Sequence, residues 1–552
     1  MDILKIVISL VDDKALRTLR AVNIGWQNLI KYSNFRLFFT RSADLLSLSQ
    51  LNRFNYPISI KFAKMIVKPE NLLPFLSSIT NLASLAFDGP LDSIPAWMSL
   101  TSLTNLTSLK TDPPPPPSIL KHLSTIRQVN IRAPDDESDL TDLTTLRNLE
   151  HLYYKLGDLD SNLQWLPNTS RLTSLIVRGY LENETRLLHK ISECVNLKKF
   201  TYEFRSTFDS FVFTRKLTAL ESLTITATVE IDLANLTRLT YLEISTPSLT
   251  NIGFLRRLKS LTWSNGKTVS NPSVYQGLTV LTSLTKVSCT SCDAELFPYL
   301  PASLKSLDIN GVWLSRIERR HIKHLTNLEK LVLFHHHVSE DFLTVNLTNL
   351  TSLKFGNPSI NQLYTVATLS SLRVLECTYL YKDQACDFWN SGVLRSLSNL
   401  EVLRCETMAP VEECYLPPNM TALYANVGDE DDRTSSCYFL TQVTQLKVLH
   451  LLGVKRNTWE NIAKLTNLEE LYLAFVDGYD EDIQCLTALA KLKNIELSLN
   501  EREITASFVT KLTNLQKISF SEMTVKDSFF FSIPLEDLNE YLPYLYKIDY
   551  VL

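Results

Sequence analysis

Apolar residues recur along most of the chain in one short phrase. Clear copies of the phrase are "LTNLEKLVL" (325–333), "LTNLTSLKF" (347–355) and "LTNLEELYL" (465–473). In the first copy, Leu331 and Leu333 alternate with Lys330, Val332 and Phe334. A period of two residues places alternate side chains on opposite faces of a β-strand. The phrase therefore predicts a short strand whose leucines face a core and whose other residues face outward.

The first half of the phrase belongs to the same core. Leu325 and Leu328 come from the turn before the strand, three residues apart. One such unit has too little apolar surface to be stable alone, so neighbouring units must stack with their strands in parallel. From Leu85 to Ile548 there are about 21 units with a mean spacing of about 23 residues, within the range for leucine-rich repeats. Outward strand residues would line a concave face, with turns and short helices on the convex side.

Residues 75–552 resemble the leucine-rich-repeat family, which implies an α/β solenoid with a curved parallel sheet. The commonest form of that family has Asn or Cys three residues after the second strand leucine. Here Asn500 and Cys292 fit that slot, whereas Pro358 and Val454 occupy it in other units. We therefore expect no regular asparagine ladder and expect units of irregular curvature.

The first 40 residues have a different pattern, with apolar positions that step by threes and fours. This spacing predicts three short helices. The first would cover about residues 2–10, and Asp12 or Asp13 would cap the second. Gly25 would separate the second helix from a third, which would end near "NFRLFF". Residues 41–74 are expected to form a linker and an irregular first unit.

This N-terminal module resembles an F-box. Leu10, Asp12, Leu16, Leu19, Val22, Trp26 and Leu29 fall on positions of the F-box motif, although the Leu-Pro that usually precedes its first helix is missing. The resemblance implies a substrate receptor of a cullin-RING (SCF-type) ubiquitin ligase. A Skp-type adaptor would bind Leu4, Val7, Leu10, Leu16, Leu19, Val22 and Trp26, and the repeats would capture a target protein. The alternative is that residues 1–40 only cap the solenoid, and that the chain is a scaffold or an inhibitor-type protein without a ubiquitin role.

Motifs for catalysis or metal binding are weak. Cys289 and Cys292 form a single C-x-x-C, which the repeat register explains without a metal. The histidines at 335–337 are expected in a solvated turn. "NGKT" (265–268) has Leu261 where a phosphate-binding loop needs glycine. We therefore expect no enzymatic activity, no metal and no cofactor.

Composition narrows the class of partner. A formal net charge of -4 gives no basic field for nucleic acid. No apolar run reaches the roughly 18–20 residues needed to cross a membrane. The nine scattered cysteines suit reduced thiols in the cytoplasm or the nucleus.

A protein partner on the concave face is the remaining expectation, because exposed aromatic residues on a rigid surface anchor such partners. The same residues also favour strands for packing reasons alone. The candidates are His151, Tyr153, Lys155, Tyr241, Glu243, Lys330, Phe334, Glu470 and Tyr472.

Overall fold

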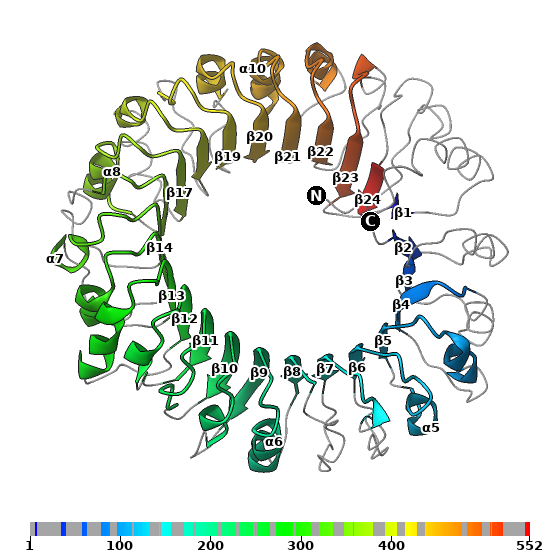
Figure 1. Cartoon of the computed structure of the whole chain (residues 1–552). Coiled ribbons are helices and arrows are strands. Elements are labelled where there is room, and N and C mark those ends of the chain that lie inside the picture. Colours follow the sequence, from blue (N-terminus) through cyan, green and yellow to red (C-terminus); the bar gives the residue numbers. More distant parts are fainter. Residues whose placement is uncertain are drawn as a thin grey trace, which may run out of the picture. The chain divides into compact units, whose positions relative to one another are not determined.

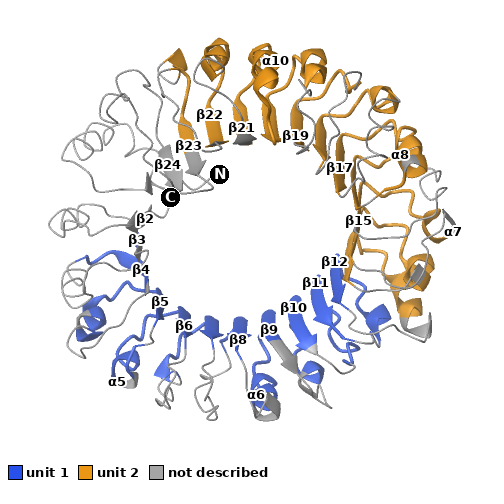
Figure 2. Cartoon of the chain, turned by 180° about the vertical axis from the view of Figure 1, so that it is seen from behind, with its two compact units in different colours: residues 1–266 blue, residues 267–552 orange. Residues whose placement is uncertain are grey.

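The computed structural model divides the chain into two compact units, Met1–Gly266 (unit 1) and Lys267–Leu552 (unit 2) (Figure 2). Besides strand segments at 6–7, 35–39, 58–62 and 547–551, it describes residues 79–88, 97–112, 115–132, 143, 145–155, 171–179, 184–206, 212–227, 231–246, 249, 251–264, 272–290, 294–310, 319–334, 347–356, 358–378, 392–405, 415–427, 437–476, 483–499, 508 and 511–522.

Unit 1 contains parallel strands that pair in chain order from β1 to β12. They are β1 (Ile6–Val7), β2 (Phe35–Phe39), β3 (Ile58–Phe62), β4 (Leu82–Asp88), β5 (Ser108–Asp112), β6 (Gln128–Arg132), β7 (His151–Lys155), β8 (Ser174–Arg178), β9 (Lys199–Ser206), β10 (Ser222–Ala227), β11 (Tyr241–Ser245) and β12 (Ser260–Ser264).

Unit 2 repeats the arrangement, with parallel pairing in chain order from β13 to β24. Its strands are β13 (Lys286–Thr290), β14 (Ser306–Asn310), β15 (Lys330–Phe334), β16 (Ser352–Gly356), β17 (Val374–Thr378), β18 (Val402–Cys405), β19 (Ala422–Asn426), β20 (Val448–Leu452), β21 (Glu470–Val476), β22 (Asn494–Leu499), β23 (Lys517–Glu522) and β24 (Lys547–Val551).

In both units, each short helix lies on the opposite side of its repeat from the strand (Figure 1). In unit 1 they are the 3-10 helices η3 (Ser99–Ser102), η6 (Val212–Arg215) and η7 (Ile252–Phe254), and α5 (Pro117–Leu120) and α6 (Glu184–Ile191). In unit 2 they are η8 (Pro272–Val280), η9 (Ala294–Tyr299), α7 (Arg319–Ile322), α8 (Ile360–Val366), η11 (Val393–Ser396), η12 (Tyr438–Gln442), η13 (Arg456–Thr458), α10 (Trp459–Ala463) and η14 (Gln484–Ala488).

The leucine phrase forms the core as its spacing predicts. Leu325, Leu328, Leu331 and Leu333 are fully buried. The backbone N–H of Leu328 donates to the carbonyl of Leu325 (3.2 Å), so the first half of the phrase is a tight turn that leads directly into the strand. Because one leucine row comes from the turns and one from the strands, each repeat adds a layer to a continuous core.

Two helix starts illustrate how local sequence decides capping. Ser359 caps α8 with a full capping box, because its hydroxyl accepts from the N–H of Gln362 and its own N–H donates to that side chain. Thr458 precedes α10 but makes no side-chain capping bond. It already belongs to η13 and has helical dihedral angles, so it does not cap the helix that follows.

The N-terminal residues depart from the helical expectation where they are described. Ile6 and Val7 form strand β1 and pair with Leu37 and Phe38 of β2, so a helix over residues 2–10 is wrong at these positions. The segment "ILKIVISLV" is rich in β-branched residues, which favour strands over helices. Strand β3 lies within the expected linker and pairs with β2 and β4. The remaining residues of 1–34, including the second predicted helix, lie outside the described residues.

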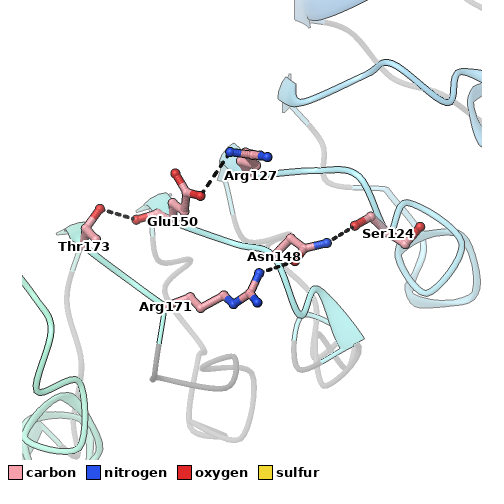
Figure 3. Close-up of polar contacts among 6 residues, drawn as sticks. All are labelled: Ser124, Arg127, Asn148, Glu150, Arg171 and Thr173. Carbon is pink, nitrogen blue, oxygen red and sulfur yellow. Dashed lines mark hydrogen bonds and ion pairs between the residues drawn. The ribbon is translucent and has the colours of Figure 1, made fainter.

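An asparagine ladder joins successive repeats, but in a different slot from the family's usual one. Figure 3 shows that Asn148 Nδ2 donates to the carbonyl of Ser124 in the preceding repeat (2.9 Å) and that its Oδ1 accepts from Arg171 (2.6 Å). The same bond to the preceding repeat is made by the "LTNL"-type asparagines Asn105, Asn327, Asn349, Asn399, Asn419, Asn467 and Asn514. In the usual slot, Pro358 and Val454 are buried.

A second polar row lies directly before the strands. Glu150 accepts an ion pair from Arg127 of the preceding repeat (3.4 Å), and its carbonyl accepts from the Thr173 hydroxyl of the next (3.1 Å) (Figure 3). Ion pairs in the same position join Lys198 to Glu221, Lys305 to Glu329, Arg373 to Glu401 and Lys493 to Glu469. Since these side chains are well exposed, each pair adds little stability.

Candidate functional site

The outward side chains of the strands form a surface that we call the strand face, one for each unit. In unit 1, His151 and Lys155 of β7 are exposed and Tyr153 is partly exposed. Arg178 of β8 donates to the Tyr153 hydroxyl (3.0 Å) and to Glu203 of β9 (2.7 Å). The bond to Glu203 raises the pKa of Arg178. The charges of Arg178 and Glu203 are therefore already paired with each other.

The other expected pair of unit 1, Tyr241 and Glu243 on β11, is joined by a hydrogen bond. The Tyr241 hydroxyl donates to the Glu243 carboxylate (2.7 Å), which also accepts from Thr224 of β10 (3.4 Å). Burial raises the pKa of Tyr241, and the neighbouring carboxylate adds to the rise. The strand face of unit 1 thus has local polar networks in which side chains partner one another.

Unit 2 contains a different feature, a row of three rings in contact across three adjacent strands. Tyr424 (β19), His450 (β20) and Tyr472 (β21) occupy the same register position. The ring centroids of Tyr424 and His450 are 4.5 Å apart, with the two rings tilted by 49°. The centroids of His450 and Tyr472 are 5.2 Å apart, and these two rings are stacked at 24°. All three side chains are partly exposed. We call these three residues the aromatic row.

Apolar residues flank the aromatic row along the strands. On the side of the strand starts lie Val402 and Val448, partly exposed, with Ala422 between them. On the other side, Leu452 is partly exposed beside the buried Ala474. The rings therefore form the centre of an apolar patch on the strand face of unit 2. Partly exposed rings of this kind, fixed by a sheet, lose little conformational entropy on binding.

Opposite charges stand at the two ends of the row. The guanidinium of Arg404 (β18) lies 4.3 Å from the centroid of the Tyr424 ring, a cation–π contact. Arg404 forms no ion pair with any described carboxylate, since the nearby Glu376 pairs with Lys354. At the other end, Glu470 is exposed and accepts only a long hydrogen bond, from Asn494 (3.3 Å).

The charge state of His450 follows from this setting. Burial between the two tyrosine rings lowers the pKa of His450, the nearby Arg404 lowers it further, and Glu470 opposes the shift. The imidazole is therefore neutral at neutral pH, which suits its stacking between the rings. A neutral row gives the patch an apolar centre between a cation and an anion.

The structure brings some expected residues together and separates others. Tyr472 belongs to the aromatic row and Glu470 lies beside it, whereas Lys330 is exposed on β15, away from the row. Val332 faces outward but is only 5% exposed, between Asp308 and Lys354 of the adjacent strands. The side chain of Phe334 lies outside the described structure, as do Leu4, Leu10, Leu16, Leu19, Val22 and Trp26, and Val7 is described only as part of β1.

Sequence reasoning did not identify Arg404, Tyr424 and His450. The signal is present in the phrases "VLRC", "ALYA", "VLHL" and "ELYL", whose third residues align across neighbouring strands. Alignment of consecutive phrases by register, instead of separate inspection of each, would have found the row.

The suspected metal and redox residues have structural roles where they are described. His321 is buried and stacks on Phe297 (6.5 Å between centroids), and Nε2 of His324 lies 2.8 Å from the carbonyl oxygen of Leu300. Cys289 is buried in the inward slot of β13, whereas Cys292 and the histidines at 335–337 are outside the described residues. Within the described ranges, no group of three or more potential ligands could hold a metal ion, and no helix is long and apolar enough to cross a membrane.

Comparisons with known proteins support the fold. No protein-family model matches the sequence, and no curated protein matches it either. Among solved structures, the mouse RP105/MD-1 complex is 15% identical over 84% of this chain and 86% of that chain, with a TM-score of 0.50. A TLR13–ssRNA13 complex is 13% identical over 86% of each chain (TM-score 0.43), and an LRR protein of Leptospira interrogans is 15% identical over 93% of this chain and 99% of that one (TM-score 0.26). The first of these likenesses, together with the repeated parallel strands, establishes a fold of the leucine-rich-repeat kind.

Proposed function

We propose that this chain is a non-enzymatic protein-binding scaffold, and that unit 2 binds its partner over the aromatic row. The observation that carries the proposal is the row of ring contacts made by Tyr424, His450 and Tyr472 on three adjacent strands, with apolar residues on both sides. Tyrosine is among the residues that most often dominate binding energy at protein interfaces. A structural role alone does not require these rings to face outward, because the leucine rows already form the core.

Site-specific photo-crosslinking tests this proposal. The full chain is expressed with p-benzoylphenylalanine in place of Tyr472, and in a parallel sample in place of Tyr364, an exposed residue (43%) of α8 on the helical side. We expect discrete protein adducts from position 472 in cells, which are lost when Tyr424→Ala and His450→Ala are added. Adducts of equal yield from position 364, or none from position 472, would contradict the proposal.

A second candidate function is the substrate receptor of an SCF-type ubiquitin ligase. It is favoured by the spacing of Leu16, Leu19, Val22 and Trp26 in the sequence. In that case the strand face would hold a target protein near a ubiquitin-charged enzyme, and the increase in effective concentration would promote transfer. The described part of the N-terminus adds no support, because β1 lies where the first helix of the motif was expected.

Co-expression with a Skp-type adaptor separates the two candidates. A receptor would co-purify with the adaptor, and Leu16→Asp combined with Leu19→Asp would abolish co-purification while circular dichroism of the repeats stays unchanged. If the intact chain does not bind the adaptor, the scaffold without a ubiquitin role remains. In both cases we place the chain in the cytoplasm or nucleus, with six described cysteines as free thiols; localisation of a fluorescent fusion tests this placement.

A further inference from the structure

We infer that the strand face of unit 2 binds an extended peptide with a fixed order of chemical groups: an acidic side chain at Arg404, apolar or aromatic side chains over the aromatic row, and a basic side chain at Glu470. This inference rests on the proposed function and names the class of partner. Its basis is the juxtaposition along β18 to β21 of three rings in contact, together with one cation and one anion, neither of which has an ion-pair partner among the described residues.

The spacing of these groups fits a short peptide. Arg404 and Tyr472 are in register across three strand steps, and Glu470 precedes Tyr472 by two residues. With about 4.8 Å per strand step and about 3.3 Å per residue along a strand, Arg404 and Glu470 are about 16 Å apart at the backbone. An extended peptide covers that distance with about five residues. The acidic and basic side chains of the partner are therefore separated by about four to five positions.

The charges of the site determine the direction in which the peptide binds. A carboxylate on the peptide can form a charge-assisted pair with the Arg404 guanidinium, whose face is already held against Tyr424. The same carboxylate placed at the other end would meet Glu470, and like charges there would weaken binding. The partner thus has one preferred orientation across the strands.

A single-stranded nucleic acid is the competing occupant, since stacked rings with an arginine also bind exposed bases. A nucleic-acid backbone carries a phosphate at every step and needs a groove of positive charge along its path. Here the path from Arg404 leads to Glu470, with Glu496 of β22 beside Tyr472. The acidic end favours a peptide of mixed charge over a polyanion.

Selection from a random peptide library tests the order directly. A display library of about nine-residue peptides, long enough to span the site, is panned against the full chain and against three variants. The variants are Arg404→Glu, Glu470→Lys and Lys286→Glu. The last is the matched control, because Lys286 is an exposed residue of the same face on β13, five strands from Arg404.

The inference predicts that enriched peptides carry Asp or Glu about five positions from Lys or Arg, in one polarity, with apolar residues between. Arg404→Glu should weaken binding of a selected peptide by about tenfold, a typical loss when one charge pair becomes repulsive, and the library should then select a base at that end. Glu470→Lys should reverse the preference at the other end, and Lys286→Glu should change neither.

Three results would overturn the inference: no enriched peptides, enriched peptides without a charge order, or an effect of Lys286→Glu equal to that of Arg404→Glu. Tight binding of a single-stranded oligonucleotide, measured by fluorescence anisotropy and lost in Tyr424→Ala, would also overturn it in favour of nucleic acid. The crosslinking at Tyr472 is independent of charge order. Protein adducts there without ordered peptides would therefore refute the inference and leave the scaffold function intact.

Discussion

The asparagine ladder predicts a specific cost for the loss of one bond between repeats. Asn399 Nδ2 donates to the carbonyl of Ser370 in the preceding repeat (2.8 Å). Asn399→Ala removes this donor, and water replaces it in part because the bond is exposed, so we expect a loss of about 1 kcal/mol in the free energy of unfolding. Leu400→Ala, at the adjacent and fully buried position, should cost about 2–5 kcal/mol through the lost packing.

Asn399→Asp sharpens the test because its effect depends on pH. An ionised carboxylate donates no hydrogen bond and is repelled by the Ser370 carbonyl oxygen, so the cost at neutral pH should exceed that of Asn399→Ala and reach about 2 kcal/mol. The protonated carboxyl can donate, which raises the pKa of the new group in the folded state. Its stabilising contribution is then present below the unfolded pKa of about 3.9 and is lost as pH rises through the folded pKa.

Urea unfolding followed by circular dichroism measures these differences in the free energy of unfolding. If the slope of this free energy against urea concentration is the same for all variants, the unfolding process is the same. Ser398→Ala is the matched control, since this exposed side chain precedes Asn399 in the same turn. Amide hydrogen exchange in β17 and β18 provides the local measurement. Equal stability of Asn399→Ala and Ser398→Ala, or a cost of Asn399→Asp that is independent of pH, would show that the ladder does not hold the repeats together.

Three further predictions concern Trp263, Cys377 and His450. Trp263 is fully buried, and its Nε1 donates to the Thr246 carbonyl (2.9 Å). Because Trp263→Phe removes this donor, it should lower the free energy of unfolding by about 1–3 kcal/mol in the same assay. An unchanged free energy of unfolding would refute the role of the bond. Burial raises the pKa of Cys377 to about 12, so this thiol should react with a maleimide only after unfolding in urea, and rapid labelling of the native chain would contradict its placement. The pKa of His450 in the folded chain lies below the ordinary value of about 6.5, so the unfolded chain binds the proton more readily. The free energy of unfolding should therefore fall as the pH decreases below that value. NMR titration measures the pKa of His450 in the folded chain. A folded pKa above the ordinary value would exclude the neutral stack.

The fold was predictable because the phrase has two independent periods. The alternation of Leu331 and Leu333 defines the strand, and the spacing of Leu325 and Leu328 defines the turn, so each copy specifies the same local structure. The conspicuous residue of the phrase, the asparagine of "LTNL", was not assigned a role. Its function depends on a carbonyl group in the preceding repeat, more than 20 residues away in the chain, and no local pattern reveals that partner.

The candidate site was only partly predictable for the same reason. Tyr472 and Glu470 were chosen as candidates from their own strand, but Tyr424, His450 and Arg404 become candidates only when adjacent strands are compared in register. At the N-terminus, helical spacing competed with β-branched residues, and at Ile6 and Val7 the β-branched preference prevailed.

The number of residues between the two partners of the asparagine bond varies, and this determines where the chain can accept insertions and deletions. Asn419 bonds to a residue 21 positions earlier and Asn399 to one 29 positions earlier, with the same geometry of 2.8 Å. The distance in sequence is thus not what defines a repeat; the defining element is the short stretch from the asparagine through the strand. The segment between one strand and the next asparagine can gain or lose several residues without any shift of the sheet. New sequence, whether it arises by mutation or is inserted as a tag or a loop, is therefore best accommodated in those intervals, where it would diversify the outer side of the protein and leave the strand face unchanged.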